Sequence, residues 1–425
     1  MSLDRMRIQG GRTLRGEIEI SGAKNAALPL LALTLLTPKG CRITNLPNLQ
    51  DVQTMVGILR ALGADVRSSG RTIEIQSKEL TQTEAPYDFV RKMRASVLLL
   101  GPLLGRFGRA RVSMPGGCAI GVRPIDQHLK AFEALGAEIH LSEGYVEAKA
   151  ARLRGGKFRF ETVTVTGTAN AIIAASRAEG VSRFENCARE PEVTAVAETL
   201  LSMGVKIGGI GTTTIEVEGV TDPDGFDCEL IPDRIETGTY LVAGAITGGE
   251  LFLRKGNASH LAAVIAKLRD TGTEIIEDPH GLRVRGRRPI RAVNFETAPF
   301  PSFPTDMQAQ LISLLCVANG TSTVKETIFE NRFMHVSELI RMGADLKTKG
   351  SVVTVTGVPK LIGAPVMATD LRASASLVLA GLAAEGVTEV LRIYHLDRGY
   401  ERMETKLSAV GADIIRVPES AEGPR

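Results

Sequence analysis

The sequence has no tryptophan, and aromatic residues make up only 4% of its 425 residues. Proteins that bind single-stranded nucleic acid stack bases on aromatic side chains, so this composition argues against a nucleic-acid clamp. The formal net charge of +3 gives no general attraction to a polyanion. The apolar stretch 26–36 is too short to span a bilayer, and we expect no secretory leader at the start of the chain. We therefore expect a cytoplasmic protein with neither a nucleic-acid nor a membrane partner.

Cysteine and histidine are too scattered to predict a metal centre. None of the five cysteines lies in a C-x-x-C pair, which argues against a disulfide framework and a zinc site. The six histidines show no metal-ligand spacing, and no phosphate-binding glycine loop or dinucleotide fingerprint follows a strand pattern. These patterns predict neither a zinc site nor a binding site for ATP or NAD.

A repeat is the dominant feature of what is present. Six segments end a helical pattern with a glycine and continue into a strand, and the glycine recurs every 68 to 73 residues. They are ILRALGADV (58–66), AFEALGAEI (131–139), LLSMGVKI (200–207), KLRDTGTEI (267–275), LIRMGADL (339–346) and KLSAVGADI (406–414). A glycine at such a place closes the last helical turn with a positive φ. Each repeat is predicted to run helix, strand, loop, helix, strand, turn, strand.

The first helix of each repeat is apolar on all sides, so it must be buried on all sides. These segments are 26–36, 95–104, 170–178, 238–246, 307–318 and 374–384. The amphipathic second helices and the strands then have to surround them. The predicted fold class is α/β, with two similar domains of three repeats each, buried helices and outer sheets.

Two N-terminal strand patterns, 6–8 and 17–20, have no repeat of their own. We assign them to the second domain, which makes that domain discontinuous. The predicted domains are residues 22–231 and residues 1–21 with 232–425, and the chain crosses between them near Ser21 and near 231–235.

Charged residues gather where the apolar helices begin. Lys24, Arg94 and Arg372 stand at such positions, although helix stability favours acidic residues there. The loops between strands and helices add Cys118, Arg123, Glu190, Arg332, His335 and Arg398. Guanidinium groups match carboxylate and phosphate in shape, so these residues predict a cleft for a small polyanionic substrate.

The same residues lie in motifs that resemble the UDP-N-acetylglucosamine enolpyruvyl transferases. The motifs are SGAKNAALP (21–29), MRAS (93–96), PGGCAIGVRPID (115–126), AREPEV (188–193), FPTDMQAQ (303–310), FENRFMHV (329–336), TDLRAS (369–374) and DRGYER (397–402). The resemblance implies two inside-out, barrel-like α/β domains with the active site in the cleft between them. It also implies transfer of the enolpyruvyl group of phosphoenolpyruvate to UDP-N-acetylglucosamine, the first committed step of peptidoglycan precursor synthesis, without a cofactor.

Residue roles follow from the resemblance. It implies that Lys24, Arg123 and Arg398 hold phosphoenolpyruvate, mostly through its phosphate. Arg332 and Arg372 would contact the same substrate and help to close the cleft.

Further residues would bind the nucleotide or do the chemistry. The resemblance implies that Cys118 protonates C3 of phosphoenolpyruvate and forms the family's covalent adduct, and that Asp306 is the base. Asp306 would also contact the 3-hydroxyl of the sugar, with Asn25 and Arg94 nearby. The remaining residues that it assigns to the substrates are Pro124, Ile125, Asp126, Gln127, Thr162, Val163, Thr164, Val165, Ile328 and Asp370.

The chain departs from the family pattern at two places, in the segment 162–168 and at residue 50. TVTGT (164–168) stands where S-V-G-A-T is common, and Thr162 and Gln50 replace frequent lysines. We therefore expect some direct contacts to the nucleotide to differ from those of the family. The shikimate-pathway enolpyruvyl transferases and a non-catalytic paralogue remain alternatives, although the former have S-K-S where this chain has AKN at 23–25.

The role of Cys118 gives the first prediction. Cys118→Ala should lose most activity near neutral pH with little change in melting temperature, because a proton donor is removed. The resemblance also implies that the epoxide fosfomycin inactivates the protein by reacting with the nucleophilic thiolate of Cys118. Cys118→Asp should therefore keep activity but resist fosfomycin, because a carboxylic acid donates a proton yet is a weak nucleophile. Turnover with and without fosfomycin measures the activity of both variants, and thermal unfolding measures the melting temperature of Cys118→Ala. Inactivation of Cys118→Asp by fosfomycin would contradict the assignment.

Overall fold

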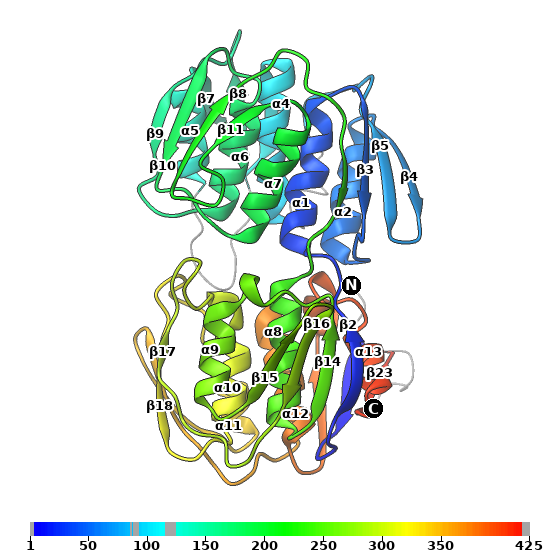
Figure 1. Ribbon diagram of the computed structural model, residues 1–425, viewed down its shortest axis with the longest axis vertical. Helices are drawn as coiled ribbons and strands as arrows, with labels where there is room; N and C mark the ends of the chain where they lie inside the picture. The colour runs from blue at the N-terminus through cyan, green and yellow to red at the C-terminus, as the bar shows by residue number, and fades with distance from the viewer. Residues whose placement is uncertain (1–3, 86, 88–92, 115–124, 419–425) are drawn as a thin grey trace. The chain divides into compact units, whose positions relative to one another are not determined.

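The computed structural model describes residues 4–85, 87, 93–114 and 125–418. They fold into two compact units (Figure 1). The described residues between 22 and 231 form the N-terminal unit, and residues 4–21 with 232–418 form the C-terminal unit. Over the described ranges, no helix is long and apolar enough to cross a membrane.

The N-terminal unit is built from the following elements. Its helices are α1 (Lys24–Leu33), α2 (Gln50–Ala61), α4 (Leu100–Phe107), α5 (Asp126–Ala134), α6 (Val165–Ala175) and α7 (Pro191–Ser202), with 3-10 turns η1 (Thr34–Leu36) and η2 (Arg94–Leu99). Its strands are β3 (Gly40–Thr44), β4 (Asp65–Ser69), β5 (Thr72–Gln76), β6 (Arg109–Ser113), β7 (Glu138–Ser142), β8 (Tyr145–Lys149), β9 (Lys157–Arg159), β10 (Val181–Glu185), β11 (Lys206–Gly208), β12 (Thr214–Glu218) and β13 (Asp227–Glu229).

The C-terminal unit repeats this order and adds the two N-terminal strands. Its helices are α8 (Arg234–Ile246), α9 (Ala262–Asp270), α10 (Gln308–Leu315), α11 (His335–Arg341), α12 (Leu371–Ala383) and α13 (Met403–Ala409), with η3 (Ala258–His260), η4 (Thr305–Met307) and η5 (Ile393–Arg398). Its strands are β1 (Arg5–Gln9), β2 (Arg15–Glu19), β14 (Glu250–Arg254), β15 (Glu274–Asp278), β16 (Gly281–Arg285), β17 (Phe295–Glu296), β18 (Thr321–Lys325), β19 (Asp345–Lys349), β20 (Val352–Thr356), β21 (Pro365–Met367), β22 (Val387–Leu391) and β23 (Asp413–Val417).

The described strands form six small sheets, one for each predicted repeat. In the first repeat, β3 pairs antiparallel with β5, and β5 forms a hairpin with β4. The second to fifth repeats use the same arrangement. The mixed α/β class predicted from the sequence is confirmed, and the six small sheets are consistent with the six predicted repeats.

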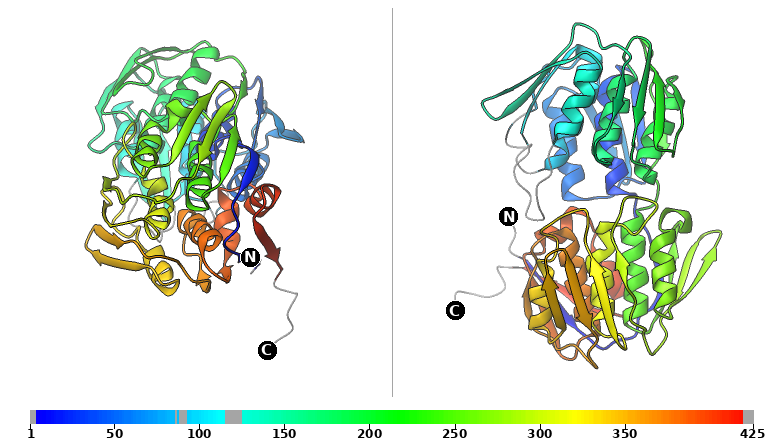
Figure 2. Two further views of the ribbon diagram at one scale, coloured as in Figure 1. Left: turned by 60° about the horizontal axis from the view of Figure 1, so that its bottom comes forward. Right: turned by 90° about the vertical axis from the view of Figure 1, so that its left-hand side faces the viewer.

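The N-terminal strands complete the C-terminal unit, as the blue ribbon shows (Figures 1 and 2). In four of the sheets an extra parallel edge strand comes from another repeat of the same unit, such as β13 beside β3 and β17 beside β18. β2 fills this place beside β14, at the first sheet of the C-terminal unit. β1 pairs with both β22 and β23, where the other repeats have the second strand of their own hairpin.

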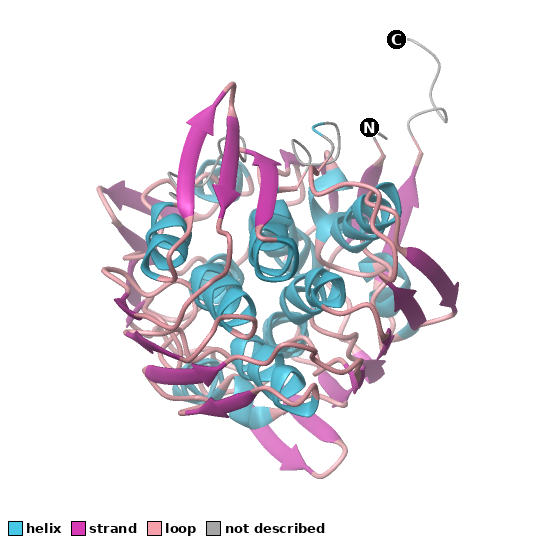
Figure 3. Ribbon diagram, turned by 90° about the horizontal axis from the view of Figure 1, so that it is seen from above, coloured by secondary structure: helices cyan, strands magenta, loops and turns pink. Residues whose placement is uncertain are grey.

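The apolar helices are buried, as their composition predicted. Every residue of α8 from Ile235 to Ile246 is buried, and so is every residue of α12 from Arg372 to Leu382. Strands such as β3 and β18 alternate between buried and exposed residues, so each sheet turns one face to the helices. Within each unit the helices lie inside and the strands outside (Figure 3).

All six repeat glycines have a positive φ, as predicted. The values are 103° for Gly63, 87° for Gly136, 89° for Gly204, 94° for Gly272, 86° for Gly343 and 98° for Gly411. Each glycine thus ends its helix and sends the chain into the following strand.

One predicted helix differs in form. The sequence predicts a continuous helix over 95–104, whereas the structure has η2 followed by α4. The side-chain amide of Asn170 explains the change. Its Nδ2 donates to Val97 O at 2.8 Å and its Oδ1 accepts from Gly101 N at 2.8 Å. These two backbone groups would pair with each other in an α-helix, so Asn170 interrupts the helix at this point.

Candidate active site

Asp306 in η4 lies between two arginines of the C-terminal unit. Arg332 Nη2 donates to Oδ1 of Asp306 at 2.6 Å, and Arg372 Nη2 donates to Oδ2 at 2.9 Å. The arginine side chains are only 6% and 4% exposed, so both guanidinium groups are shielded from solvent. Each carboxylate oxygen therefore has its own cation, which orients the carboxylate.

The two arginines also set the charge of this carboxylate. Burial raises the pKa of Asp306, but Arg372 and Arg332 outweigh burial and hold that pKa well below its usual range. Burial lowers the pKa of Arg372, and Asp306 more than compensates, so the net pKa of Arg372 is raised. Asp306 is thus ionised at neutral pH and is a weak base while both arginines hold it.

The buried carboxylate of Glu326 positions the segments that carry these residues. Glu326 is 3% exposed and accepts hydrogen bonds from the hydroxyls of Thr297 and Thr305, both at 2.8 Å. Its Oε1 also accepts the backbone N–H of Ile328 at 2.8 Å. The Thr305 hydroxyl in turn accepts from Arg332 Nη1 at 2.9 Å. Glu326 therefore joins the predicted residue Ile328 to Asp306 and Arg332, although it lies outside the motifs 303–310 and 329–336.

Other predicted residues of the C-terminal unit have local roles. Asp370 caps α12, because its Oδ1 accepts the backbone N–H groups of Arg372 and Ala373. Arg398 is half-buried at the end of η5. His335 is buried at the start of α11, and burial lowers its pKa to about 4. A substrate contact of Asp370 or Arg398 stays a prediction.

The N-terminal unit contains a second group of predicted residues. Lys24 begins α1, is 8% exposed, and donates from Nζ to Asp51 Oδ2 at 3.2 Å. Asn25 follows it and is half-buried. Sequence reasoning missed Asp51, although an acidic residue in the first turn of an amphipathic helix is a detectable signal. Lys24 thus has a buried carboxylate partner at 3.2 Å.

Buried His128 lies at the centre of a hydrogen-bonded network in this unit. Its Nδ1 accepts from Asn170 Nδ2 at 3.1 Å, because Asn170 Oδ1 already accepts from Gly101 N. The ring proton is therefore on Nε2, which donates to Thr166 Oγ1 at 3.2 Å. Burial, followed by the charge of Arg94, lowers the pKa of His128 to about 4. His128 is therefore neutral at pH 7. The sequence motifs did not indicate this network.

The structure brings two predicted nucleotide segments together. Gln127 Oε1 accepts the backbone N–H of Glu161 at 2.8 Å, which ties the start of α5 to the chain before Thr162. Thr164 caps α6 by accepting from Gly167 N at 3.2 Å. The other predicted residues of these segments and of η2 are Arg94 at the start of η2, buried Ile125, half-buried Asp126, exposed Thr162 and Val163, and Val165 at the first position of α6.

Three predicted residues, Cys118, Arg123 and Pro124, lie outside the described residues. Among the described thiols, burial raises the pKa of Cys41 to about 11 and those of Cys187, Cys228 and Cys316 to about 12. These four thiols are protonated and unreactive at neutral pH.

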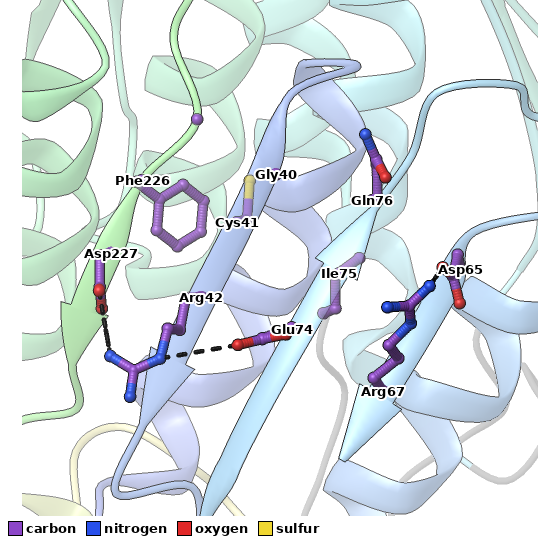
Figure 4. Close-up of a pocket in the computed structure, with 11 residues that line it drawn as sticks. Gly40, Cys41, Arg42, Asp65, Arg67, Glu74, Ile75, Gln76, Phe226 and Asp227 are labelled. Atoms are coloured by element: carbon purple, nitrogen blue, oxygen red, sulfur yellow. Dashed lines mark hydrogen bonds and ion pairs between the residues drawn. The ribbon is translucent and has the colours of Figure 1, made fainter. Parts of the chain in front are cut away.

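A hollow of about 440 Å³ lies on the sheet that contains β3, β4, β5 and β13 (Figure 4). Arg42 pairs there with Asp227 at 3.0 Å, and Arg67 pairs with Asp65 at 3.1 Å. Its charged groups are thus paired with one another, and its described lining residues include none of the predicted site residues. In the part of the chain that the structure describes, no group of three or more His, Cys, Asp or Glu residues could hold a metal ion.

Comparisons with known proteins cover nearly the whole chain. The family described as EPSP synthase (3-phosphoshikimate 1-carboxyvinyltransferase) matches residues 8–407. The UDP-N-acetylglucosamine 1-carboxyvinyltransferase of Geotalea daltonii is 52% identical over 417 residues, which is 98% of this chain and 100% of that protein. The protein of the same name from Myxococcus xanthus is 55% identical over 417 residues, with 97% of this chain and 99% of the relative covered.

A solved structure has the same fold. The enolpyruvyl transferase NikO from Streptomyces tendae matches with a TM-score of 0.89 and 26% identity. The match covers 98% of this chain and 100% of that chain.

The neutral state of His128 predicts a specific pH dependence. Its folded pKa of about 4 lies below the ordinary value near 6.5, so the unfolded chain binds a proton first as the pH falls. Stability present above pH 6.5 is therefore lost progressively down to pH 4, by about 2 kcal/mol between pH 7 and pH 5. His128→Asn should lose about 2 kcal/mol less than the native chain over that interval in chemical denaturation.

The exposed His140 of β7 provides the control. His140→Asn should retain the full loss of stability between pH 7 and pH 5. An equal loss in His128→Asn would show that His128 is not buried in its neutral form.

Proposed function

The chain belongs to the UDP-N-acetylglucosamine 1-carboxyvinyltransferase family, and from that premise we propose that it transfers the enolpyruvyl group of phosphoenolpyruvate to UDP-N-acetylglucosamine. The acceptor is the 3-hydroxyl of the sugar, phosphate is released, and the product is a peptidoglycan precursor. We expect the reaction to take place in the cytoplasm. The observation that carries the proposal is the ionised Asp306 held by two buried arginines, at the position that the family motif assigns to the acceptor hydroxyl.

The reaction is an addition followed by an elimination. The 3-hydroxyl oxygen attacks C2 of phosphoenolpyruvate while C3 receives a proton, which gives a tetrahedral ketal. The C–O bond to phosphate then breaks, and the proton that leaves C3 restores the double bond. Because C2 accepts the hydroxyl only when C3 is protonated, a general acid is required, and the motif assigns this role to Cys118.

Cations have to neutralise the charge of phosphoenolpyruvate and of the departing phosphate. The motifs assign Lys24, Arg123 and Arg398 to the phosphate, and Arg332 and Arg372 to the same substrate. Lys24 belongs to the N-terminal unit, whereas Arg332, Arg372 and Arg398 belong to the C-terminal unit. The proposal therefore requires groups from both units to act on one substrate molecule.

Asp306 acts as the base, for the hydroxyl proton or for the C3 proton. In the free protein its pKa is too low for this task, because Arg372 and Arg332 hold it. Phosphoenolpyruvate is itself an anion, so it competes with Asp306 for these guanidinium groups. When the arginines turn to the substrate, the pKa of Asp306 rises, and the carboxylate becomes a better proton acceptor.

Phosphate release tests the proposal. The purified chain should release phosphate from phosphoenolpyruvate with UDP-N-acetylglucosamine, and fosfomycin should abolish the release. With shikimate 3-phosphate in place of the sugar nucleotide, release should stay at background. Release with shikimate 3-phosphate would support the shikimate-pathway activity instead, and no release with either acceptor would indicate a non-catalytic paralogue.

A further inference from the structure

The hydroxyl of Tyr400 lies where α8, α10 and α12 meet in the C-terminal unit. It is 2.8 Å from Thr239 Oγ1 on α8, 3.2 Å from Gln310 Nε2 on α10 and 3.3 Å from Arg372 Nη1 on α12. Tyr400 is 1% exposed, so no bulk water can replace these partners. A single oxygen atom thus connects three buried helices beside Asp306.

The direction of the hydrogen bonds follows from Thr239. Its hydroxyl donates its one hydrogen to Ile235 O at 2.7 Å, so it acts as the acceptor toward Tyr400, and it also lies 3.3 Å from Gln310 Nε2. The Tyr400 hydrogen therefore points to Thr239, and the phenol oxygen keeps its lone pairs for other donors. Arg372 Nη1 and Gln310 Nε2 are these donors.

Both donors, Arg372 and Gln310, also form a hydrogen bond to Asp306. Arg372 donates from Nη1 to Tyr400 and from Nη2 to Asp306 Oδ2, so the phenol fixes one branch of the guanidinium fork and the carboxylate fixes the other. Gln310 Nε2 lies 2.9 Å from the backbone oxygen of Asp306 as well. Tyr400 thus restrains both the guanidinium group of Arg372 and, through Gln310, the backbone of Asp306.

We propose that Tyr400 is a positioning residue for the transfer reaction, which holds Arg372 in the orientation that engages Asp306 and then phosphoenolpyruvate. It does so without touching the substrate, because its hydroxyl is fully committed to Thr239, Gln310 and Arg372. The kinetic part of this inference rests on the proposed function, since Arg372 is assigned to phosphoenolpyruvate by the family motif.

Tyr400→Phe removes the oxygen and keeps the ring. Arg372 then loses the acceptor of Nη1 while Asp306 still holds Nη2, so the guanidinium group is less well oriented and the KM for phosphoenolpyruvate should rise about tenfold. The KM for UDP-N-acetylglucosamine and kcat should change by less than about threefold, because Tyr400 reaches phosphoenolpyruvate through Arg372, whereas Gln310 keeps its hydrogen bond to the backbone of Asp306. This split between the two substrates distinguishes positioning from a general loss of stability.

Tyr240→Phe is the matched control. Tyr240 follows Thr239 on α8, is 0% exposed, and its hydroxyl has no hydrogen-bond partner among the described residues. This variant removes the same kind of atom, a buried phenol oxygen, from α8, the helix that carries Thr239, without affecting Arg372. It should leave both KM values within about twofold of the native chain.

A second measurement does not depend on activity. The pKa of the Asp306 carboxyl, followed by 13C NMR and assigned by its absence in Asp306→Asn, should rise in Tyr400→Phe and stay unchanged in Tyr240→Phe. If the native chain releases no phosphate, the proposed function fails, while this comparison still tests the role of Tyr400. If the native chain is active, both measurements apply.

Thr239→Val gives an independent variant if Tyr400→Phe does not fold. It removes the acceptor of the Tyr400 hydrogen, so the phenol can rotate, and the KM for phosphoenolpyruvate should rise in the same direction by a smaller factor. The proposal is overturned if the variants at Tyr400 and Thr239 match Tyr240→Phe in both the KM values and the pKa of Asp306. It is also overturned if both substrates lose affinity equally.

Discussion

The carboxylate of Asp306, held between Arg332 and Arg372, is the interaction on which the site of the C-terminal unit depends. A buried guanidinium group without a partner is costly, and breaking a buried pair costs about 3–5 kcal/mol. The three residues come from η4, from the turn before α11 and from the start of α12, so their mutual attraction joins three segments of the chain. Glu326 accepts a hydrogen bond from Thr305, and Tyr400 accepts one from Arg372. These hydrogen bonds restrict the geometry of the cluster. The arrangement is therefore oriented before any substrate binds.

The repeat explains why the predicted substrate-binding cations stand at comparable places. In each unit the buried helices are enclosed by sheets, so their first residues are the places where a buried scaffold meets the loops. Lys24 begins α1, Arg94 begins η2 and Arg372 is the second residue of α12. Cations are unfavourable at helix N-termini, so these positions weaken the local helix. Such a cost is expected where the residue serves binding, and anionic phosphoenolpyruvate would offset it.

Much of the fold could be predicted because its signals are local. A glycine that ends a helix, an apolar helix and an alternating strand are each recognisable within about fifteen residues, and the structure confirms them in six repeats. The break between η2 and α4 was not predictable, because it depends on Asn170, about seventy residues away. The completion of two sheets by β1 and β2 depends on pairing with strands far along the chain. Sequence patterns indicate the elements but not such distant partners.

The residues of the candidate site could likewise be predicted only in part from the sequence. The motifs predicted Asp306, Arg332 and Arg372 individually, and the structure brings these three together, whereas the predicted substrate contacts of Thr162 and Val163 stay predictions. The partners Asp51, His128, Glu326 and Tyr400 were not identified, because each matters only through a neighbour that is distant in sequence. Tyr400 and Thr239, for example, are 161 residues apart. Their importance is visible only when distances and hydrogen-bond directions are known.

The most direct test of the account is the turnover number of Asp306→Asn in the phosphate-release reaction with both substrates. Asparagine keeps the shape of the side chain and can still accept a hydrogen bond from an arginine, but it cannot accept a proton. If Asp306 is the base, kcat should fall by about 10² to 10⁴ without a rise in the KM for phosphoenolpyruvate. A kcat within about threefold of the native value would contradict the central claim that this carboxylate takes part in the chemistry.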